Sequence, residues 1–77
     1  MEDELNIFVN KMKEKYNEKV VSYGHSWKTC DIDFLEQRLI GEFIEYIKSE
    51  NPKELVDIAN ICWMLYSRKE TNQGEGD

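Results

Sequence analysis

Cysteine and histidine are scarce in this 77-residue chain, which has two cysteines, Cys30 and Cys62, and one histidine, His25. Two cysteines form neither a disulfide framework nor a zinc-binding pattern. The histidine is not part of a Glu-x-x-His sequence of the kind that di-iron helical bundles use, which argues against a di-iron protein. We therefore expect two reduced thiols, as is usual in the cytoplasm.

Positive charge is also in short supply, because 10 Lys and Arg residues face 16 Asp and Glu residues and the formal net charge is −6. This balance argues against binding to a nucleic-acid polymer. No apolar run is long enough for a membrane span: the longest, Leu55 to Tyr66, is interrupted by Asp57 and Asn60. The N-terminal sequence MEDELNIF is acidic, unlike a signal peptide. We expect a soluble, cytoplasmic protein.

Apolar periodicity predicts an all-α chain of three helices. The first covers residues 3–21, with one apolar stripe at three- and four-residue steps and a Lys/Glu-rich opposite face. That stripe consists of Leu5, Phe8, Val9, Met12, Tyr16 and Val20. The second helix is expected to begin near Asp33, which forms a capping-box pattern with Glu36, and to end near Ser49.

The third helix is predicted to start at Pro52 after Asn51 as its N-cap, and to end near Lys69. It is apolar nearly all round, and three helices cannot bury it, so we expect a homodimer or dimer of dimers that forms a four-helix-type bundle. The short connection should make the second and third helices an antiparallel hairpin. Residues 1–69 would form one domain, and residues 70–77 a disordered tail.

Four acidic side chains form two matched pairs, Glu42-x-x-Glu45 and Glu54-x-x-Asp57. Each pair has the spacing of one helix face and lies in an apolar segment, where an uncompensated carboxylate is costly. In a hairpin the two pairs lie at similar distances from the turn, so we expect all four carboxylates to converge. Mg²⁺, or alternatively Mn²⁺, would relieve their repulsion, and an all-oxygen ligand set favours these ions over zinc.

Three of the four acidic residues also have simpler interpretations as ordinary helix contacts. These are the ion pairs of Glu42 with Arg38 and of Glu45 with Lys48, and a capping box between Glu54 and Asn51. Asp57 is harder to explain in this way, because it lies in an apolar run beyond the first helical turn.

The sequence EFIE at 42–45, followed by ELVDIAN at 54–60, resembles the MazG-like, all-α nucleoside triphosphate pyrophosphohydrolases. The preceding stretches YNEKVVSYGHSW and FLEQRL are similar to the approach to that motif, so the resemblance covers roughly residues 16–66. One departure is the gap between the two pairs, which has eight residues and is shorter than is usual in the family.

The resemblance implies hydrolysis of (deoxy)nucleoside triphosphates to monophosphate and pyrophosphate, by helical bundles that work as dimers or tetramers. It implies Glu42, Glu45, Glu54 and Asp57 as Mg²⁺ ligands, with one of the glutamates also orienting the attacking water. The alternative function is a non-catalytic helical interaction or nucleotide-binding module.

Other side chains are candidates for binding the nucleotide. Trp27 could stack on the base, and Asn60 could hydrogen-bond the sugar or a ligand carboxylate. Candidate phosphate contacts are Lys28, Arg38 and Lys53. The alternatives are core packing for Trp27, a buried amide bonded to a neighbouring helix for Asn60, and ordinary surface charge for the basic residues. His25 is a weaker candidate, as a general base, because a metal-activated water needs no histidine.

Overall fold

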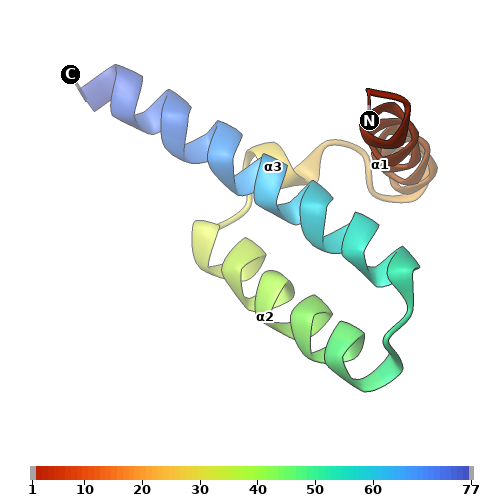
Figure 1. Ribbon diagram of the computed structural model, residues 1–77. Helices are drawn as coiled ribbons and strands as arrows, with labels where there is room; N and C mark the ends of the chain where they lie inside the picture. Colours follow the sequence, from red (N-terminus) through yellow and green to blue (C-terminus); the bar gives the residue numbers. More distant parts are fainter. Residues whose placement is uncertain (1, 77) are drawn as a thin grey trace.

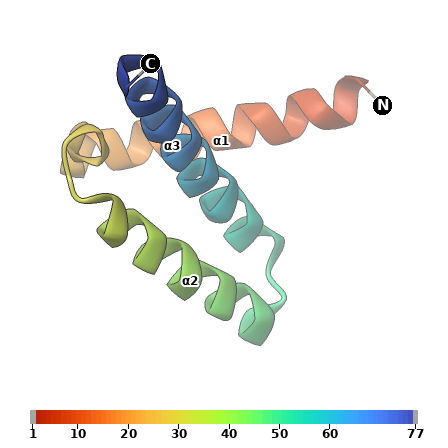
Figure 2. The ribbon, with the colours of Figure 1, turned by 90° about the vertical axis from the view of Figure 1, so that its left-hand side faces the viewer.

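The computed structural model describes the backbone of residues 2–76 and the side chains of residues 3–71. Over this range the chain is all-helical, as predicted. Its elements are α1 (Glu2–Tyr23), the short 3-10 helix η1 (Ser26–Lys28), α2 (Ile32–Ser49) and α3 (Pro52–Gly76). α3 packs against both α2 and α1, and α1 crosses it (Figures 1 and 2). None of the described helices is both long and apolar enough to traverse a bilayer.

The start of α2 differs from the predicted capping box. The N-cap is Asp31, whose side chain makes no capping hydrogen bond, and Asp33 lies in the first turn. The amides of Phe34 and Leu35 donate to the Asp31 carbonyl oxygen at 3.1 and 3.4 Å. The helix starts early enough to bring Ile32 against the core, and this packing outweighs the local preference for a cap at Asp33.

The connection between α2 and α3 is only two residues long and is tightly bonded. Glu50 adopts the left-handed conformation with φ 55° that commonly ends a helix. Asn51 then accepts a hydrogen bond from the Lys53 amide to its Oδ1 at 3.0 Å, which confirms Asn51 as the N-cap of α3. The connection holds the first turns of α3 beside the last turns of α2 (Figure 1).

The core lies between α2, α3 and η1 and is centred on Leu35, Ile61 and Leu65. The partly buried hydrophobic residues that pack around it are Trp27, Cys30, Ile32, Leu39 and Met64. The Trp27 carbonyl accepts a hydrogen bond from the Arg68 guanidinium at 2.7 Å, which ties η1 to α3. This contact fixes the segment that follows α1, and with it the place where α1 meets the rest of the fold.

The end of α3 also differs from the prediction. The helix continues through Gly76 instead of ending near Lys69, so the residues expected to form a disordered tail are helical as far as they are described, and Asp77 lies outside the described residues. Extending an existing helix needs no new nucleus, which lowers the cost of the extra turns. Thr71 Oγ1 donates to the Ser67 carbonyl within this extension, at 2.9 Å.

Much apolar surface stays open to solvent. α3 is not covered all round, since Trp63 and Tyr66 remain exposed. One set lies on α2, where four residues at helical spacing are each 47–56% exposed and form an outer stripe. The outer stripe consists of Ile40, Phe43, Ile44 and Ile47.

Candidate metal centre

Three of the four predicted carboxylates converge in the structure. Glu42 comes from α2, and Glu54 and Asp57 come from the first two turns of α3. One oxygen from each of the three lies within 4.8 Å of the others. The short connection between α2 and α3 explains this meeting, because it sets the two helices in register near their joined ends.

Glu45 is not a member of this group, so the expectation that all four carboxylates converge was wrong for this residue. Its side chain is exposed on α2. Three residues along an α-helix turn the side chain by about 60° relative to Glu42, which is enough to move Glu45 off the face that packs on α3.

Asp57 is the most constrained member of the cluster. Its side chain is 14% exposed, and its Oδ1 is buried without a hydrogen-bond partner. The nearest cations are the ammonium groups of Lys19 at 3.6 Å and Lys15 at 3.9 Å. Both distances exceed those of a hydrogen bond, so the charge is only partly compensated.

The two lysines beside Asp57 were missed by sequence reasoning. Lys15 and Lys19 lie one turn apart on α1, outside the apolar stripe and among the residues of its Lys/Glu-rich face. Their i, i+4 spacing places two cations on one side of the helix, and this is the only signal the sequence holds for them. That α1 presents this side to Asp57 depends on how α1 crosses α3.

The pKa of Glu42 is affected by the neighbouring carboxylates of the cluster. Burial raises the pKa of the Glu42 carboxyl above its ordinary value of 4.5, and Asp57 and Glu54 raise it further. Lys19 and Arg38 oppose the rise. The Glu42 carboxyl is therefore harder to ionise beside Asp57 and Glu54 than a free glutamate would be.

These residues fit a hard divalent cation such as Mg²⁺ or Mn²⁺. The three ligand atoms are all carboxylate oxygens, and one oxygen of the Asp57 carboxylate, Oδ1, has no hydrogen-bond partner. Glu54 is not engaged in the alternative capping box, because the Asn51 amide donates instead to Ser49 Oγ at 3.1 Å. Three protein ligands would leave room for water or phosphate oxygens on the ion.

A cavity of about 380 Å³ adjoins the cluster, and we call it the aromatic pocket. Its lining consists of Tyr16, Lys19, Val20, Tyr23, Gly24, Ser26, Trp27, Phe34, Arg38 and Met64. Lys19 and Arg38 carry the charge of this lining, and both lie at its border with the cluster. Arg38 approaches Glu42 at 3.9 Å, and Lys19 approaches Asp57 at 3.6 Å. The pocket therefore combines aromatic rings with positive charge next to the carboxylates.

Trp27 and Arg38, two of the predicted nucleotide contacts, line the aromatic pocket. The Trp27 ring is partly buried against Trp63, with 5.0 Å between ring centroids, and its Nε1 donates to the Tyr16 hydroxyl at 3.0 Å. Trp27 therefore both packs against the fold and lines the aromatic pocket. The ion pair of Arg38 with Glu42 likewise matches the simpler interpretation of these two residues.

The other predicted contacts lie away from this pocket. Asn60 is buried, and its Nδ2 donates to the Met12 carbonyl on α1 at 3.0 Å, which matches the buried-amide alternative. Lys28 is exposed, with its ammonium 5.9 Å from the centroid of the Trp27 ring. His25 Nδ1 lies 2.6 Å from the Tyr16 hydroxyl, so the histidine supports the connection after α1.

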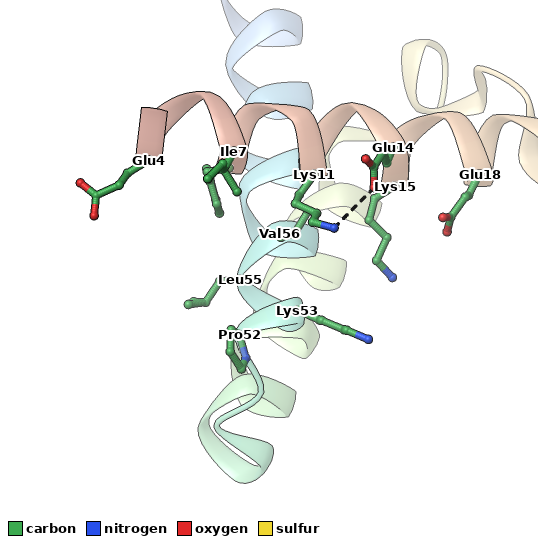
Figure 3. Close-up of a pocket in the computed structure, with 11 residues that line it drawn as sticks. Glu4, Ile7, Lys11, Glu14, Lys15, Glu18, Pro52, Lys53, Leu55 and Val56 are labelled. Atoms are coloured by element: carbon green, nitrogen blue, oxygen red, sulfur yellow. Dashed lines mark ion pairs between the residues drawn. The ribbon is translucent and has the colours of Figure 1, made fainter. Parts of the chain in front are cut away.

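Lys53 lies in a second hollow, the α1–α3 groove, between α1 and the start of α3 (Figure 3). Lysines and glutamates alternate along its rim, and Lys11 pairs with Glu14 at 3.8 Å. Lys15 projects from α1 into the same groove (Figure 3). Because its charges are mixed, this groove is a less obvious anion site than the aromatic pocket.

No family model matches the chain, and no match is found among curated proteins or solved structures. The likeness to MazG-like proteins therefore rests on the residues that carry it, above all the pairs at 42–45 and 54–57.

Proposed function

We propose that this protein is a divalent-metal-dependent nucleoside triphosphate pyrophosphohydrolase of the cytoplasm. The observation that carries the proposal is the cluster of three carboxylates, in which Asp57 has a buried Oδ1 without a hydrogen-bond partner. Such an oxygen is costly unless a cation meets it, and the two nearby lysines stand too far away to do so fully.

Glu42, Glu54 and Asp57 would hold the ion, Mg²⁺ or Mn²⁺. When bound, it would neutralise phosphate charge and polarise the bonds of the phosphoryl group. Water would attack the α-phosphorus. The bond from the α-phosphorus to the oxygen that bridges it to the β-phosphorus would break, and this oxygen would leave with pyrophosphate. The other product is a nucleoside monophosphate. One of the two glutamates in the cluster, Glu42 or Glu54, would also orient the water and accept its proton.

The aromatic pocket supports a nucleotide as the ligand. Its volume of about 380 Å³ falls within the range of small-molecule sites. Trp27, Tyr23 and Phe34 offer apolar ring surface for a base, which any base can use for stacking. Lys19 and Arg38, on the side of the pocket nearest the carboxylates, are placed for the phosphates.

The proposal includes a homodimer, in which a second copy of the chain covers exposed apolar surface. The outer stripe of α2 is apolar and half-exposed, and a chain of 77 residues has limited core to stabilise it alone. We propose that α2 and α3 act as an antiparallel hairpin and that the hairpins of two copies pack through the outer stripe as a four-helix-type bundle. A dimer of dimers would extend the same arrangement.

The direct test is incubation of the protein with the common ribo- and deoxyribonucleoside triphosphates and Mg²⁺, followed by separation of products. We expect monophosphate and pyrophosphate from at least one substrate. The Asp57→Asn variant should lose at least about a hundredfold in turnover, since it removes a charged ligand, while circular dichroism shows an unchanged helix content. Release of single phosphates, or full turnover by Asp57→Asn, would refute the proposed mechanism.

A non-catalytic interaction module is the second candidate, and the open outer stripe is the observation that favours it. Such a module needs no cation at the carboxylates. A divalent ion that binds only the folded chain should raise its melting temperature. A wild-type protein whose melting temperature is unaffected by Mg²⁺ and Mn²⁺ would therefore favour the interaction module.

A further inference from the structure

Two lysines on α1 share one carboxylate oxygen but border different hollows. Lys15 and Lys19 approach Asp57 Oδ1 at 3.9 and 3.6 Å. Lys19 also lines the aromatic pocket, whereas Lys15 lines the α1–α3 groove (Figure 3). Both side chains are more than one-third exposed, so each ammonium group can leave Asp57 without crossing the core.

We propose that Lys19 is a shared cation, which balances Asp57 while no metal is bound and turns to a nucleotide phosphate once a divalent ion occupies the cluster. The inference rests on the proposed function, because it needs the ion at Glu42, Glu54 and Asp57. It assigns Lys19 a role in substrate binding that follows from its place between the carboxylates and the pocket.

Electrostatics gives the reason for the exchange. A divalent ion at the carboxylates satisfies Asp57 better than an ammonium group beyond hydrogen-bonding distance, and it repels Lys19 at the same time. The flexible stem of a lysine lets its ammonium group move while the backbone of α1 stays in place. The pocket beside it would then hold phosphates that need a cation.

Lys15 is a matched control. It sits one turn earlier on the same helix, at a similar distance from the same oxygen, and is exposed to a similar degree. It differs in that it lies on the side of the groove and does not line the aromatic pocket. Both lysines should therefore compete with the metal, but only Lys19 should assist the nucleotide.

The test compares wild type with Lys19→Gln, Lys15→Gln and Lys19→Arg. Calorimetry measures the affinity of each for Mn²⁺ alone. We expect both glutamine variants to bind Mn²⁺ about three- to tenfold more tightly, since a competing charge is gone. Tryptophan fluorescence at saturating Mn²⁺ measures the affinity for the non-hydrolysable α,β-imido analogues of the four common deoxynucleoside triphosphates.

For the analogue that wild type binds best, Lys19→Gln should lose about tenfold or more in affinity, as expected for a lost charged phosphate contact, while Lys15→Gln stays within about twofold. Lys19→Arg should behave as wild type in both measurements. Circular dichroism establishes that each variant is folded. Opposite changes in metal and nucleotide affinity would not follow from a purely structural role for Lys19.

The inference is overturned if Lys19→Gln binds Mn²⁺ no more tightly than wild type, or if it loses no more analogue affinity than Lys15→Gln. Absence of analogue binding by wild type overturns it as well. These results leave the proposed function standing if wild type still binds Mn²⁺ and releases pyrophosphate. A wild-type chain that binds no Mn²⁺ overturns both.

Discussion

Asp57 and Glu42 show the effect of bringing three carboxylates together on single residues. An aspartate in an apolar helix is tolerated when its charge is met, and here the charge is met incompletely by Lys15 and Lys19. Glu42 responds to the same crowding with a raised pKa. Asn60 is a contrasting buried polar residue, because its amide nitrogen donates a hydrogen bond to the Met12 carbonyl.

The raised pKa of Glu42 predicts a pH-dependent stability in the metal-free protein. The folded chain holds the Glu42 proton more tightly than the unfolded chain, so this stabilisation is present below the ordinary value of 4.5 and is lost as pH rises through the raised pKa. Glu42→Gln stays neutral at every pH. With a chelator present, its melting temperature should exceed that of wild type by a few degrees near about pH 7 and converge with it near about pH 4.

Saturating Mn²⁺ is the control for this measurement, because the ion should stabilise wild type at neutral pH and reverse the order of the two proteins. If the difference in melting temperature is the same throughout the pH range, the titration of Glu42 is not its cause.

At the scale of elements, the two-residue connection between α2 and α3 brings the three carboxylates together. Glu50 ends α2 in the left-handed conformation, and Asn51 caps α3 directly afterwards. This leaves little freedom in how Glu54 and Asp57 face Glu42. Capping of this kind is local, and the sequence Asn51-Pro52 correctly predicted the cap and the first residue of α3.

Removal of the N-cap should therefore weaken both the fold and the site. Asn51→Ala loses the acceptor for the Lys53 amide and should cost about 1 kcal/mol in the free energy of unfolding. In a domain of this size that corresponds to a fall of about 4–8 °C in melting temperature. Asn51→Asp keeps an acceptor oxygen at the same place and should retain most of the stability. An Asn51→Ala variant as stable as wild type would show that the cap does not anchor α3.

At the scale of the whole molecule, the main feature is a small buried core beside a large exposed apolar surface. The buried centre is small, whereas α2 exposes its outer stripe and α1 exposes Leu5 and Ile7 near its N-terminus. In Figure 2 the N-terminal half of α1 extends beyond α3. Contiguous apolar surface of this kind marks association sites in soluble proteins, and a two-fold pairing of the outer stripe would cover it.

The substitution Ile44→Lys tests this pairing. A two-fold interface buries the change twice, so the dissociation constant of the dimer should rise at least about a hundredfold, as measured by analytical ultracentrifugation. Val21→Lys places the same charge at a valine that is 87% exposed on α1, and this control should leave the dimer intact. A wild-type chain that is monomeric, or an Ile44→Lys chain that still dimerises as wild type does, would exclude the outer stripe as the interface.

Local patterns allowed much of this molecule to be predicted. The helix period predicted an all-α chain, and the Asn51-Pro52 signal placed the start of α3 at the observed residue. The same period selected Glu42, Glu54 and Asp57, which do converge. Prediction failed where packing competes with local preference, as at Asp33, where burial of Ile32 moves the helix start, and at Glu45, which the helix rotation carries outward.

The sequence by itself determined the elements and the chemistry of the carboxylates, because hydrogen bonding along a helix and capping at a turn involve residues close together in the chain. Only the tertiary structure decided that Lys15 and Lys19 face Asp57 and that Asn60 bonds to α1. Those contacts join residues about 40 or more positions apart, and they depend on the angle at which α1 crosses α3. That angle follows from the packing of whole helix surfaces, which no local pattern specifies.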